Sequence, residues 1–359
     1  MTQMRTEIGE QPAVVARLAT GDPERYREVC AAARASGAAF VLYVARGTSD
    51  NAAVYGQYLA SVRAGLPSGL VLPSATTLYH ADLDLRRCLV IGISQSGETP
   101  DVAESLADAR SRGAFTVAIT NDARSPLAQA ADFALPTEAG VERAVAATKT
   151  YTSQLAVLAL LWASWSNDRA LVAALREEVP QAMAGGLEVE PQVSMLAGEL
   201  ASADRLLVVA RGYNLATGLE TALKVQETAA VAALPYSAAD LMHGPIAMLA
   251  PGLPVLCFAP AGATQANLLE VTLVLRDRGA RVVLIAPEAA AERVGAVPLA
   301  SPAVSQPPAI SWIPIAEVPE AVSPLVAIIP GQLLACRLAI ARGRDPDRPA
   351  GLTKVTHTR

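Results

Sequence analysis

Three charged residues that could move a proton recur at helical spacing in the second half of the chain. Glu220, Lys224 and Glu227 are four and three positions apart, so on a helix they project from one face. Their neighbours are largely apolar, which predicts that this face is half-buried and that the pKa values of a carboxylate and an ammonium are tuned for proton transfer. A solvated row of ion pairs is the alternative interpretation.

His243 is the histidine best placed to exchange a proton near neutral pH. It directly precedes Gly244-Pro245, and a turn of that composition would present the imidazole on a rigid backbone. A structural role is the alternative. Lys354 lies in a polar tail, where the pattern alone indicates a solvated charge.

A polar turn with the sequence SQSGET, Ser94–Thr99, follows the apolar run 89–93 and precedes a helical pattern. The turn therefore lies at a helix N-terminus, where hydroxyl and backbone N–H groups could hold a phosphate and Gly97 would allow close approach. The absence of a Gly-x-x-x-x-Gly-Lys run argues against a nucleotide P-loop. An ordinary strand-to-helix turn is the alternative. The segment Val145–Thr150, also rich in small residues, indicates a plain helix N-terminus by pattern alone.

The elements that must position these residues alternate between strand and helix. The first half predicts four strands and two helices: strands over 40–45, 70–72, 89–93 and 115–119, and helices over 50–64 and 101–111. This order predicts a parallel sheet with right-handed crossovers, whose ligands lie at the carboxyl ends of the strands. The polar turns 46–49 and 94–99 both lie at such ends.

The second half repeats this plan at an offset of about 165 residues. Three features recur in register: residues 44–47 (VARG) at 209–212, the strand 89–93 at 254–258, and residues 112–114 (RGA) at 278–280. Ala259 and Pro260 stand where the second copy would need Ser94 and Gln95, so we expect one phosphate site per chain.

These patterns predict an α/β fold with two tandem, doubly wound parallel-sheet domains. The expected parts are an N-terminal helical segment at 1–34, a first domain at 35–166, a second domain at 200–342 and a tail at 343–359. The expected linking elements are a helical stretch over 142–165, a polar proline-containing connection over 166–200, a loop over 297–324 with one strand at 310–313, and a closing helix over 322–341. The tail reads as structureless.

Composition limits the class of protein. The net charge of −5 gives no electrostatic reason to expect nucleic acid or a membrane surface as a partner. Four scattered cysteines indicate a reducing, cytoplasmic setting, and three histidines without clustered thiols argue against a metal site. The first residues show no signal peptide, and the apolar run 155–165 is too short to span a bilayer, so we expect it to be a buried helix.

Together these motifs resemble the family of proteins with two SIS (sugar isomerase) domains, whose sheets are flavodoxin-like. The segments that carry the resemblance are Gly47–Ser49, Ser94–Thr99, Ala146–Lys149, Glu220–Glu227 and His243–Pro245, within a match from Glu7 to Lys354. The chain is similar to the isomerase half of glucosamine-6-phosphate synthase. Over Arg46–Asn51 it looks more like the stand-alone glucosamine-6-phosphate deaminases of this family.

The resemblance implies two groups of site residues. Those that would bind the substrate and its phosphate are Gly47, Thr48, Ser49, Ser94, Gln95, Ser96, Thr99, Val145 and Ala146. Among the residues that would be catalytic, Glu227 matches the base that moves a proton between C1 and C2, and Lys224 matches its lysine partner. His243 matches a histidine that helps to open the sugar ring and is lent by the neighbouring subunit. Lys354 matches a tail lysine that can form an imine with the open-chain ketose.

The activity implied is that of an aldose–ketose isomerase and deaminase, which converts glucosamine 6-phosphate to fructose 6-phosphate and ammonia. It implies a homodimer in the cytoplasm, without metal or cofactor and without nucleic-acid or membrane partners. Three alternatives are open. The enzyme could be an isomerase, deglycase or deaminase for another sugar phosphate, such as galactosamine 6-phosphate or fructosamine 6-phosphate. It could transfer externally supplied ammonia, as a synthase does, or it could be a non-catalytic sugar-phosphate-binding regulator.

The chain departs from the synthase pattern at several positions. Arg46 replaces a cysteine, Ala147 a serine and Met242 a lysine. Thr2 follows the initiator methionine in place of a nucleophilic cysteine, so we expect no glutamine-derived ammonia within this chain. These changes leave the identity of the sugar open.

Overall fold

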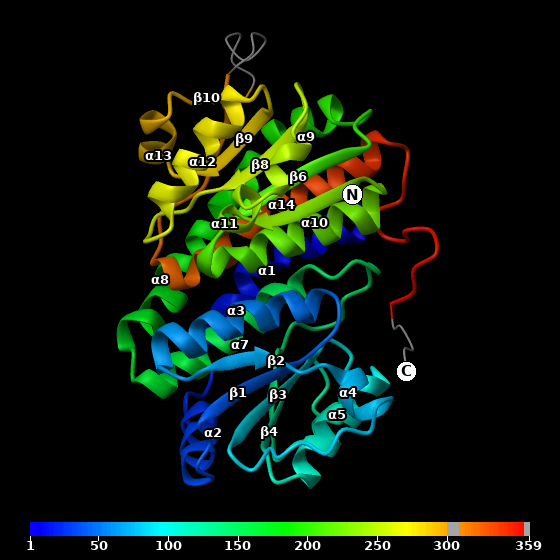
Figure 1. Ribbon diagram of the computed structural model, residues 1–359, viewed down its shortest axis with the longest axis vertical. Helices are drawn as coiled ribbons and strands as arrows, with labels where there is room; N and C mark the ends of the chain where they lie inside the picture. Colours follow the sequence, from blue (N-terminus) through cyan, green and yellow to red (C-terminus); the bar gives the residue numbers. More distant parts are fainter. Residues whose placement is uncertain (300–308, 355–359) are drawn as a thin grey trace. The chain divides into compact units, whose positions relative to one another are not determined.

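The computed structural model describes residues 1–299 and 309–354, and Figure 1 shows their helices and strands. They form two compact units, each built around one parallel sheet. The first-sheet unit comprises Ala13–Glu142, Lys149–Arg176 and the described residues from Thr353 onward. The second-sheet unit comprises Met1–Pro12, Arg143–Thr148 and the described part of Glu177–Leu352.

The first sheet has the strand order β2-β1-β3-β4-β5, and every neighbouring pair is parallel. Its strands are β1 (Phe40–Val44), β2 (Ser68–Leu70), β3 (Cys88–Ser94), β4 (Phe115–Thr120) and β5 (Phe133–Pro136). This is the flavodoxin-like order, so the prediction of a doubly wound parallel sheet is confirmed. All seven residues of β3 are buried, as expected for a central strand covered on both faces.

Helices cover the first sheet on both faces (Figure 1). On one face α3 (Thr48–Ala64) packs against α7 (Lys149–Ser166), and on the other α5 (Pro100–Ser111) packs against α6 (Pro126–Ala130). The unit also contains the short helix α4 (Pro73–Thr77) and α2 (Glu24–Ala35), which packs on α7. The buried helix expected over 155–165 is confirmed as part of α7.

The second sheet has the order β10-β11-β9-β8-β6-β7 and is also parallel throughout. Its strands are β6 (Arg205–Ala210), β7 (Ala232–Ser237), β8 (Pro254–Phe258), β9 (Arg281–Ala286), β10 (Val297–Pro298) and β11 (Ser311–Pro314). The repeat read from the sequence is therefore real: β1 and β6 correspond, as do β3 and β8.

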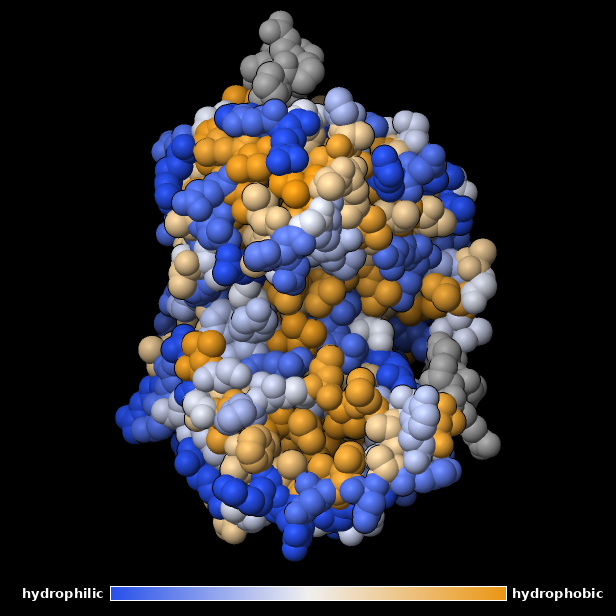
Figure 2. Space-filling view, in the orientation of Figure 1, coloured by the Kyte–Doolittle hydropathy of each residue, from blue (hydrophilic) through white to orange (hydrophobic). Residues whose placement is uncertain are grey.

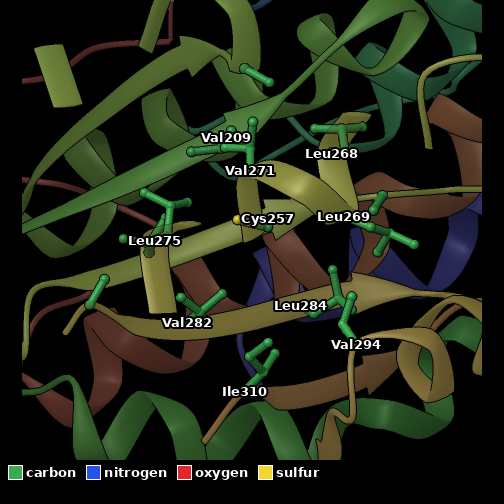
Figure 3. Close-up of a cluster of buried hydrophobic side chains, with 14 of the residues drawn as sticks. Val209, Cys257, Leu268, Leu269, Val271, Leu275, Val282, Leu284, Val294 and Ile310 are labelled. Atoms are coloured by element: carbon green, nitrogen blue, oxygen red, sulfur yellow. The ribbon is translucent and has the colours of Figure 1, made fainter. Parts of the chain in front are cut away.

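On one face of the second sheet, buried apolar residues form a core with the helices that follow β7, β8 and β9. In Figure 3, Val209, Cys257 and Leu284 of the sheet pack against Leu268 and other residues of α12 (Gln265–Asp277). This core also takes residues from α11 (Ala238–Met242) and α13 (Glu288–Arg293). The helix α14 (Ser323–Ala341) packs against both α10 (Leu215–Ala229) and α9 (Glu190–Glu199).

The closing helix predicted over 322–341 is confirmed as α14. Together with the residues before it, Glu320–Ala341, it is the one helix of the described residues that is long and apolar enough to cross a membrane. However, 83% of its apolar window is buried within the protein, so it is packed as a core helix. On the face shown in Figure 2, hydrophobic and hydrophilic residues are interspersed.

The helix expected over 142–165 begins only at Lys149, so that prediction is wrong for its first turns. The backbone N–H groups of 143–145 have partners outside any helix: Arg143 N donates to Glu7 Oε1 at 2.5 Å, and Val145 N donates to the carbonyl of Asp347 at 3.0 Å. These bonds keep residues 143–145 out of a helix, because a backbone N–H already bonded elsewhere cannot bond within a helix.

The polar, proline-containing connection predicted over 166–200 is mostly helical. It contains α8 (Arg169–Gly186), the 3₁₀ turn Leu187–Val189 and α9. Leu171, Leu175 and Val179 are buried at intervals of four, an apolar stripe that drives helix formation and outweighs the proline content. Pro180 lies inside α8, and Pro191 sits in the first turn of α9, where a proline costs little.

Smaller differences between the predicted and the observed elements occur near the two chain ends and at the edge strands of the sheets. The expected 1–34 segment forms α1 (Gln3–Thr20) and α2, and the strand expected at 70–72 lies at Ser68–Leu70, where it pairs with β1. The loop 297–324 holds two short strands instead of one, and its residues 300–308 lie outside the described residues. The described part of the tail forms no helix or strand, yet it is anchored, because the Asp347 carboxylate accepts the N–H groups of Gln3 and Met4 at 2.8 Å each. His357 and the rest of 355–359 lie outside the description.

Candidate functional site

The Ser94–Thr99 turn joins the carboxyl end of β3 to the first residue of α5. Ser94 Oγ accepts the backbone N–H of Gly97 at 3.1 Å and lies 3.2 Å from the Thr99 hydroxyl. Ser96 Oγ accepts the N–H of Glu98 at 3.2 Å. The hydroxyls of the turn therefore converge at a helix N-terminus, an arrangement that can hold an anion.

Gly97 lets this turn pack against its own sheet. Its φ is +67°, a region that side-chain-bearing residues rarely adopt, and a β-carbon there would lie 2.1 Å from Ser125 Oγ. Its carbonyl accepts the N–H of Leu127 at 3.0 Å, and the Gln95 carbonyl accepts the N–H of Asn121 at 3.1 Å. The turn is thus fixed by the segment that follows β4.

The turn 46–49 lies at the carboxyl end of β1, the strand next to β3. Gly47 has a φ of +55° and precedes α3, whose first residues are Thr48 and Ser49. The Ser49 hydroxyl is buried and accepts a hydrogen bond from Gln154 Nε2 at 2.9 Å. Both turns therefore lie at the carboxyl edge of one sheet, as predicted.

Arg46 is fixed beside the anion turn by a residue that the sequence reading missed. Its guanidinium contacts Asp101 Oδ2 at 2.7 Å through both Nε and Nη2, and the Asp101 side chain is 3% exposed. Asp101 lies in the first turn of α5, where a carboxylate is favoured by the helix dipole. The sequence signal that could have identified Asp101 is its position just after Pro100, in the first turn of a predicted helix. Burial raises the pKa of nearby Asp50, and the charge of Arg46 partly offsets this rise.

In the second-sheet unit, α10 carries the charged face predicted for proton transfer. Lys224 Nζ lies 2.5 Å from Glu227 Oε2 and 3.6 Å from Glu220 Oε1. The side chains of Lys224 and Glu220 are 1% and 0% exposed, and that of Glu227 is 24% exposed. This excludes the solvated row of ion pairs, and the face is buried more deeply than expected. Of the three side chains, only that of Glu227 is partly exposed to solvent, and the buried ammonium of Lys224 contacts its carboxylate.

His243 directly follows α11 and is exposed. Its backbone N–H donates to Asp240 O at 3.1 Å, and Gly244 follows with a φ of +132° before the 3₁₀ turn at Pro245–Met248. Among the described residues, no side-chain hydrogen bond or ion pair joins His243 to Lys224 or Glu227. The structure of one chain therefore brings the lysine and the glutamate together and leaves the histidine on the surface.

Lys354 is not a solvated charge. Its Nζ lies 2.7 Å from Glu142 Oε2, and the Glu142 side chain is 0% exposed. Glu142 also accepts the N–H and hydroxyl of Thr150 at 3.1 and 2.7 Å, at the start of α7. All three residues belong to the first-sheet unit. Glu142 is a second residue missed by sequence reading, because the contact joins positions far apart in the chain.

Val145 and Ala146 lie in the second-sheet unit, within the non-helical segment 143–148. Ala146 is 2% exposed, and the Val145 N–H is bonded to Asp347. The expected site residues thus fall into two groups. The first-sheet unit holds 47–49, 94–99 and Lys354, and the second-sheet unit holds 145–146, Lys224, Glu227 and His243.

A family model described as "SIS domain" matches residues 37–164 and 199–293 of this chain. Glutamine–fructose-6-phosphate aminotransferase (isomerizing) of Methanothermobacter thermautotrophicus is 38% identical over 314 residues, which are 88% of this chain and 51% of that protein. The chain spans about half the length of the curated relatives it matches.

Two solved structures are similar over nearly the whole chain. The C-terminal domain of glucosamine-fructose-6-phosphate aminotransferase from Francisella tularensis has a TM-score of 0.86 and 26% identity, covering 97% of this chain and 98% of that one. A candidate phosphosugar isomerase from Silicibacter pomeroyi has a TM-score of 0.83 and 34% identity, covering 97% of this chain and 100% of that one.

Proposed function

The chain belongs to the SIS domain family and is homologous to the isomerase half of glutamine–fructose-6-phosphate aminotransferase, and on that premise we propose that it acts on an amino-sugar phosphate. The proposed reaction is the conversion of glucosamine 6-phosphate and water to fructose 6-phosphate and ammonia. The observation that carries the proposal is the contact between buried Lys224 and the partly exposed carboxylate of Glu227.

The Lys224–Glu227 pair has the properties of a general base. The buried ammonium of Lys224 lies 2.5 Å from Glu227 Oε2, so it fixes the position of this carboxylate. After the ring has opened, Glu227 would take the proton from C2 of the aldehyde form and return it to C1. The product is the imine at C2, and water then adds to this carbon and expels ammonia. The steps are proton transfers, the addition of water and the elimination of ammonia, so the chain's own acid and base groups suffice.

The Ser94–Thr99 turn supplies the proposed phosphate site. The phosphate takes no part in the chemistry, so its binding energy can be used to hold the reacting carbons in place. Thr48 and Ser49, at the end of the neighbouring strand, lie at the same edge of the sheet. The preference for a deaminase over a synthase rests on residues 46–51, which look like those of the stand-alone deaminases.

The proposal extends to three properties that one chain does not reveal. We propose a homodimer in which His243 of one subunit assists ring opening in the other, which agrees with the exposure of His243. We propose that Lys354 can form an imine with the open-chain ketose, for which it must first leave Glu142 and lose its proton. We propose a cytoplasmic location, in keeping with four buried free thiols.

The test is ammonia release from glucosamine 6-phosphate, with fructose 6-phosphate detected in a coupled assay. Galactosamine 6-phosphate, fructosamine 6-phosphate and glucose 6-phosphate serve as comparison substrates. We expect stoichiometric ammonia and fructose 6-phosphate from glucosamine 6-phosphate. Interconversion of glucose 6-phosphate and fructose 6-phosphate without ammonia release would favour a plain isomerase.

A sugar-phosphate sensor would behave differently. It would bind the sugar phosphate with an affinity that Glu227→Gln leaves unchanged, and the wild-type protein would turn over none of the substrates. That combination of results would overturn the proposal that the chain is an enzyme.

A further inference from the structure

The turn after β8 is the second copy of the Ser94–Thr99 turn. It has the sequence APAGAT, residues 259–264, so the glycine and the threonine at its fourth and sixth positions are kept as Gly262 and Thr264. The other four positions have become alanine or proline. The turn again joins a strand to the N-terminus of a helix, α12, and Gly262 again has a positive φ, of +143°.

A carboxylate from another element occupies this second turn. Glu320, which begins the 3₁₀ turn before α14, accepts the N–H of Ala263 with Oε2 at 2.8 Å. Its Oε1 accepts the hydroxyl of Thr264 at 3.1 Å. A β-carbon on Gly262 would lie 2.1 Å from the Glu320 carboxyl carbon. The glycine kept in the turn is therefore what admits the carboxylate.

The surroundings of the second turn are also those of an anion site. Arg211 is the counterpart of Arg46, but its guanidinium bonds to the neutral amide oxygen of Asn267 instead of to a carboxylate. The residue after it, Gly212, approaches the turn so closely that a β-carbon there would lie 2.8 Å from Thr264 Cγ2. A cation thus remains at the end of β6 without the aspartate that neutralises its counterpart in the first copy.

We propose that the second turn is an oxyanion site which the chain fills with its own Glu320 carboxylate, and which this internal ligand closes to phosphate. Carboxylate and phosphate oxygens accept the same hydrogen bonds from backbone N–H and hydroxyl groups. An internal ligand competes at an effective concentration on the order of millimolar or above, so it excludes a weakly held free anion. The comparison with the first turn rests on the proposed function, whereas the contacts of Glu320 do not.

The experiment measures thermal denaturation of Glu320→Ala in sodium phosphate and in sodium chloride of equal ionic strength. We expect phosphate to raise the Tm of this variant by about 2–4 °C more than that of the wild type, because the ion binds the folded state at the vacated turn. The control is Glu317→Ala, which removes an exposed glutamate three positions earlier and should respond to phosphate as the wild type does.

Two further variants test the site itself. Glu320→Gln keeps an amide oxygen that can accept the Ala263 N–H, so it should show the wild-type response. Adding Thr264→Val to Glu320→Ala removes a donor of the turn and should abolish the extra rise. A crystal of Glu320→Ala grown with phosphate should show the ion bonded to Ala263 N.

An equal phosphate response in Glu320→Ala and Glu317→Ala, with no ion at Ala263, would overturn the proposal. If Glu320→Ala does not fold in chloride, the proposal requires that phosphate restore folding, and failure to do so is equally decisive. If the first turn binds no phosphate, phosphate should not raise the Tm of the wild type, but it should still raise the Tm of Glu320→Ala more than that of Glu317→Ala. The two proposals therefore fail independently.

Discussion

At the scale of single residues, the lysine between two glutamates on α10 is the feature with most consequence. A buried ammonium needs a compensating charge, and Lys224 has one carboxylate at 2.5 Å and another at 3.6 Å. Because Glu220 is as deeply buried as the lysine, it can balance the ammonium charge while Glu227 exchanges its proton. The two glutamates on this helix face therefore have different roles, and only their burial shows which role each one has.

Glu227→Gln should lower kcat for ammonia release at least 100-fold while the substrate KM changes little. The amide keeps the shape of the side chain but cannot accept the C2 proton, and general-base catalysis is typically worth that factor or more. Steady-state kinetics on glucosamine 6-phosphate measure both constants. Glu270→Gln, at an exposed position of α12, should behave as the wild type. A kcat within threefold of the wild type would remove Glu227 from the role of base.

Gly97 and Gly65 form a matched pair for testing the anion turn. Both have a φ of +67°, but a β-carbon at 97 would lie 2.1 Å from Ser125 Oγ, whereas the space around Gly65 is open to 4 Å. Gly65→Ala should therefore cost about 1 kcal/mol of unfolding free energy from backbone strain alone. Gly97→Ala should cost more and should also raise KM, because the turn must move to admit the methyl group. Urea unfolding and steady-state kinetics give the two values, and equal losses would show that packing at Gly97 is unimportant.

At the scale of elements, one carboxylate joins three helices of the second-sheet unit. Glu190 of α9 is 2.8 Å from Arg5 Nε of α1 and 2.9 Å from Arg337 Nε of α14. Burial alone would raise the pKa of Glu190, but the hydrogen bonds from the two arginines outweigh it and lower the pKa below its ordinary value. The stabilisation is therefore present above the unfolded-state pKa and is lost as the pH falls through the folded-state pKa.

Glu190→Gln should accordingly reduce the unfolding free energy by about 1–2 kcal/mol at pH 7, a range set by partly exposed charge-assisted hydrogen bonds. The difference from the wild type should shrink as the pH falls below about 4, because the carboxyl of the unfolded chain then takes up a proton before that of the folded chain does. Urea unfolding between pH 3.5 and 7.5 measures it. Glu188→Gln, an exposed glutamate two positions earlier, is the control. A difference that does not depend on pH would contradict the charge argument.

At the scale of the whole molecule, a second subunit is proposed to contribute His243 to the site that holds Glu227. This arrangement predicts complementation between two inactive variants. Glu227→Gln and His243→Ala homodimers should each be nearly inactive. After co-refolding, mixed dimers have one site that carries both defects and one that carries neither, so up to about a quarter of wild-type activity should return. No recovery in dimers shown to be mixed would confine His243 to its own subunit.

Local pattern was enough for much of the fold. The run of β3, the SQSGET turn and the 220, 224, 227 spacing are signals carried by adjacent residues, and the repeat at about 165 residues links the two sheets by comparison alone. The start of α7 was predicted wrongly, because the N–H groups of residues 143–145 are bonded to Glu7 and Asp347, which lie far from them in sequence. No local rule carries that information.

The sequence by itself determined the two parallel sheets, the place of the anion turn at a strand end, and the common face of Lys224 and Glu227, since each depends on the period of a helix or strand. Tertiary structure decided which charges are paired. Lys354 meets Glu142 across 212 positions, Asp101 holds Arg46, and Glu320 fills the second copy of the turn. These contacts form because chain segments remote in sequence are packed together, and a buried charge must then find whichever partner the packing provides.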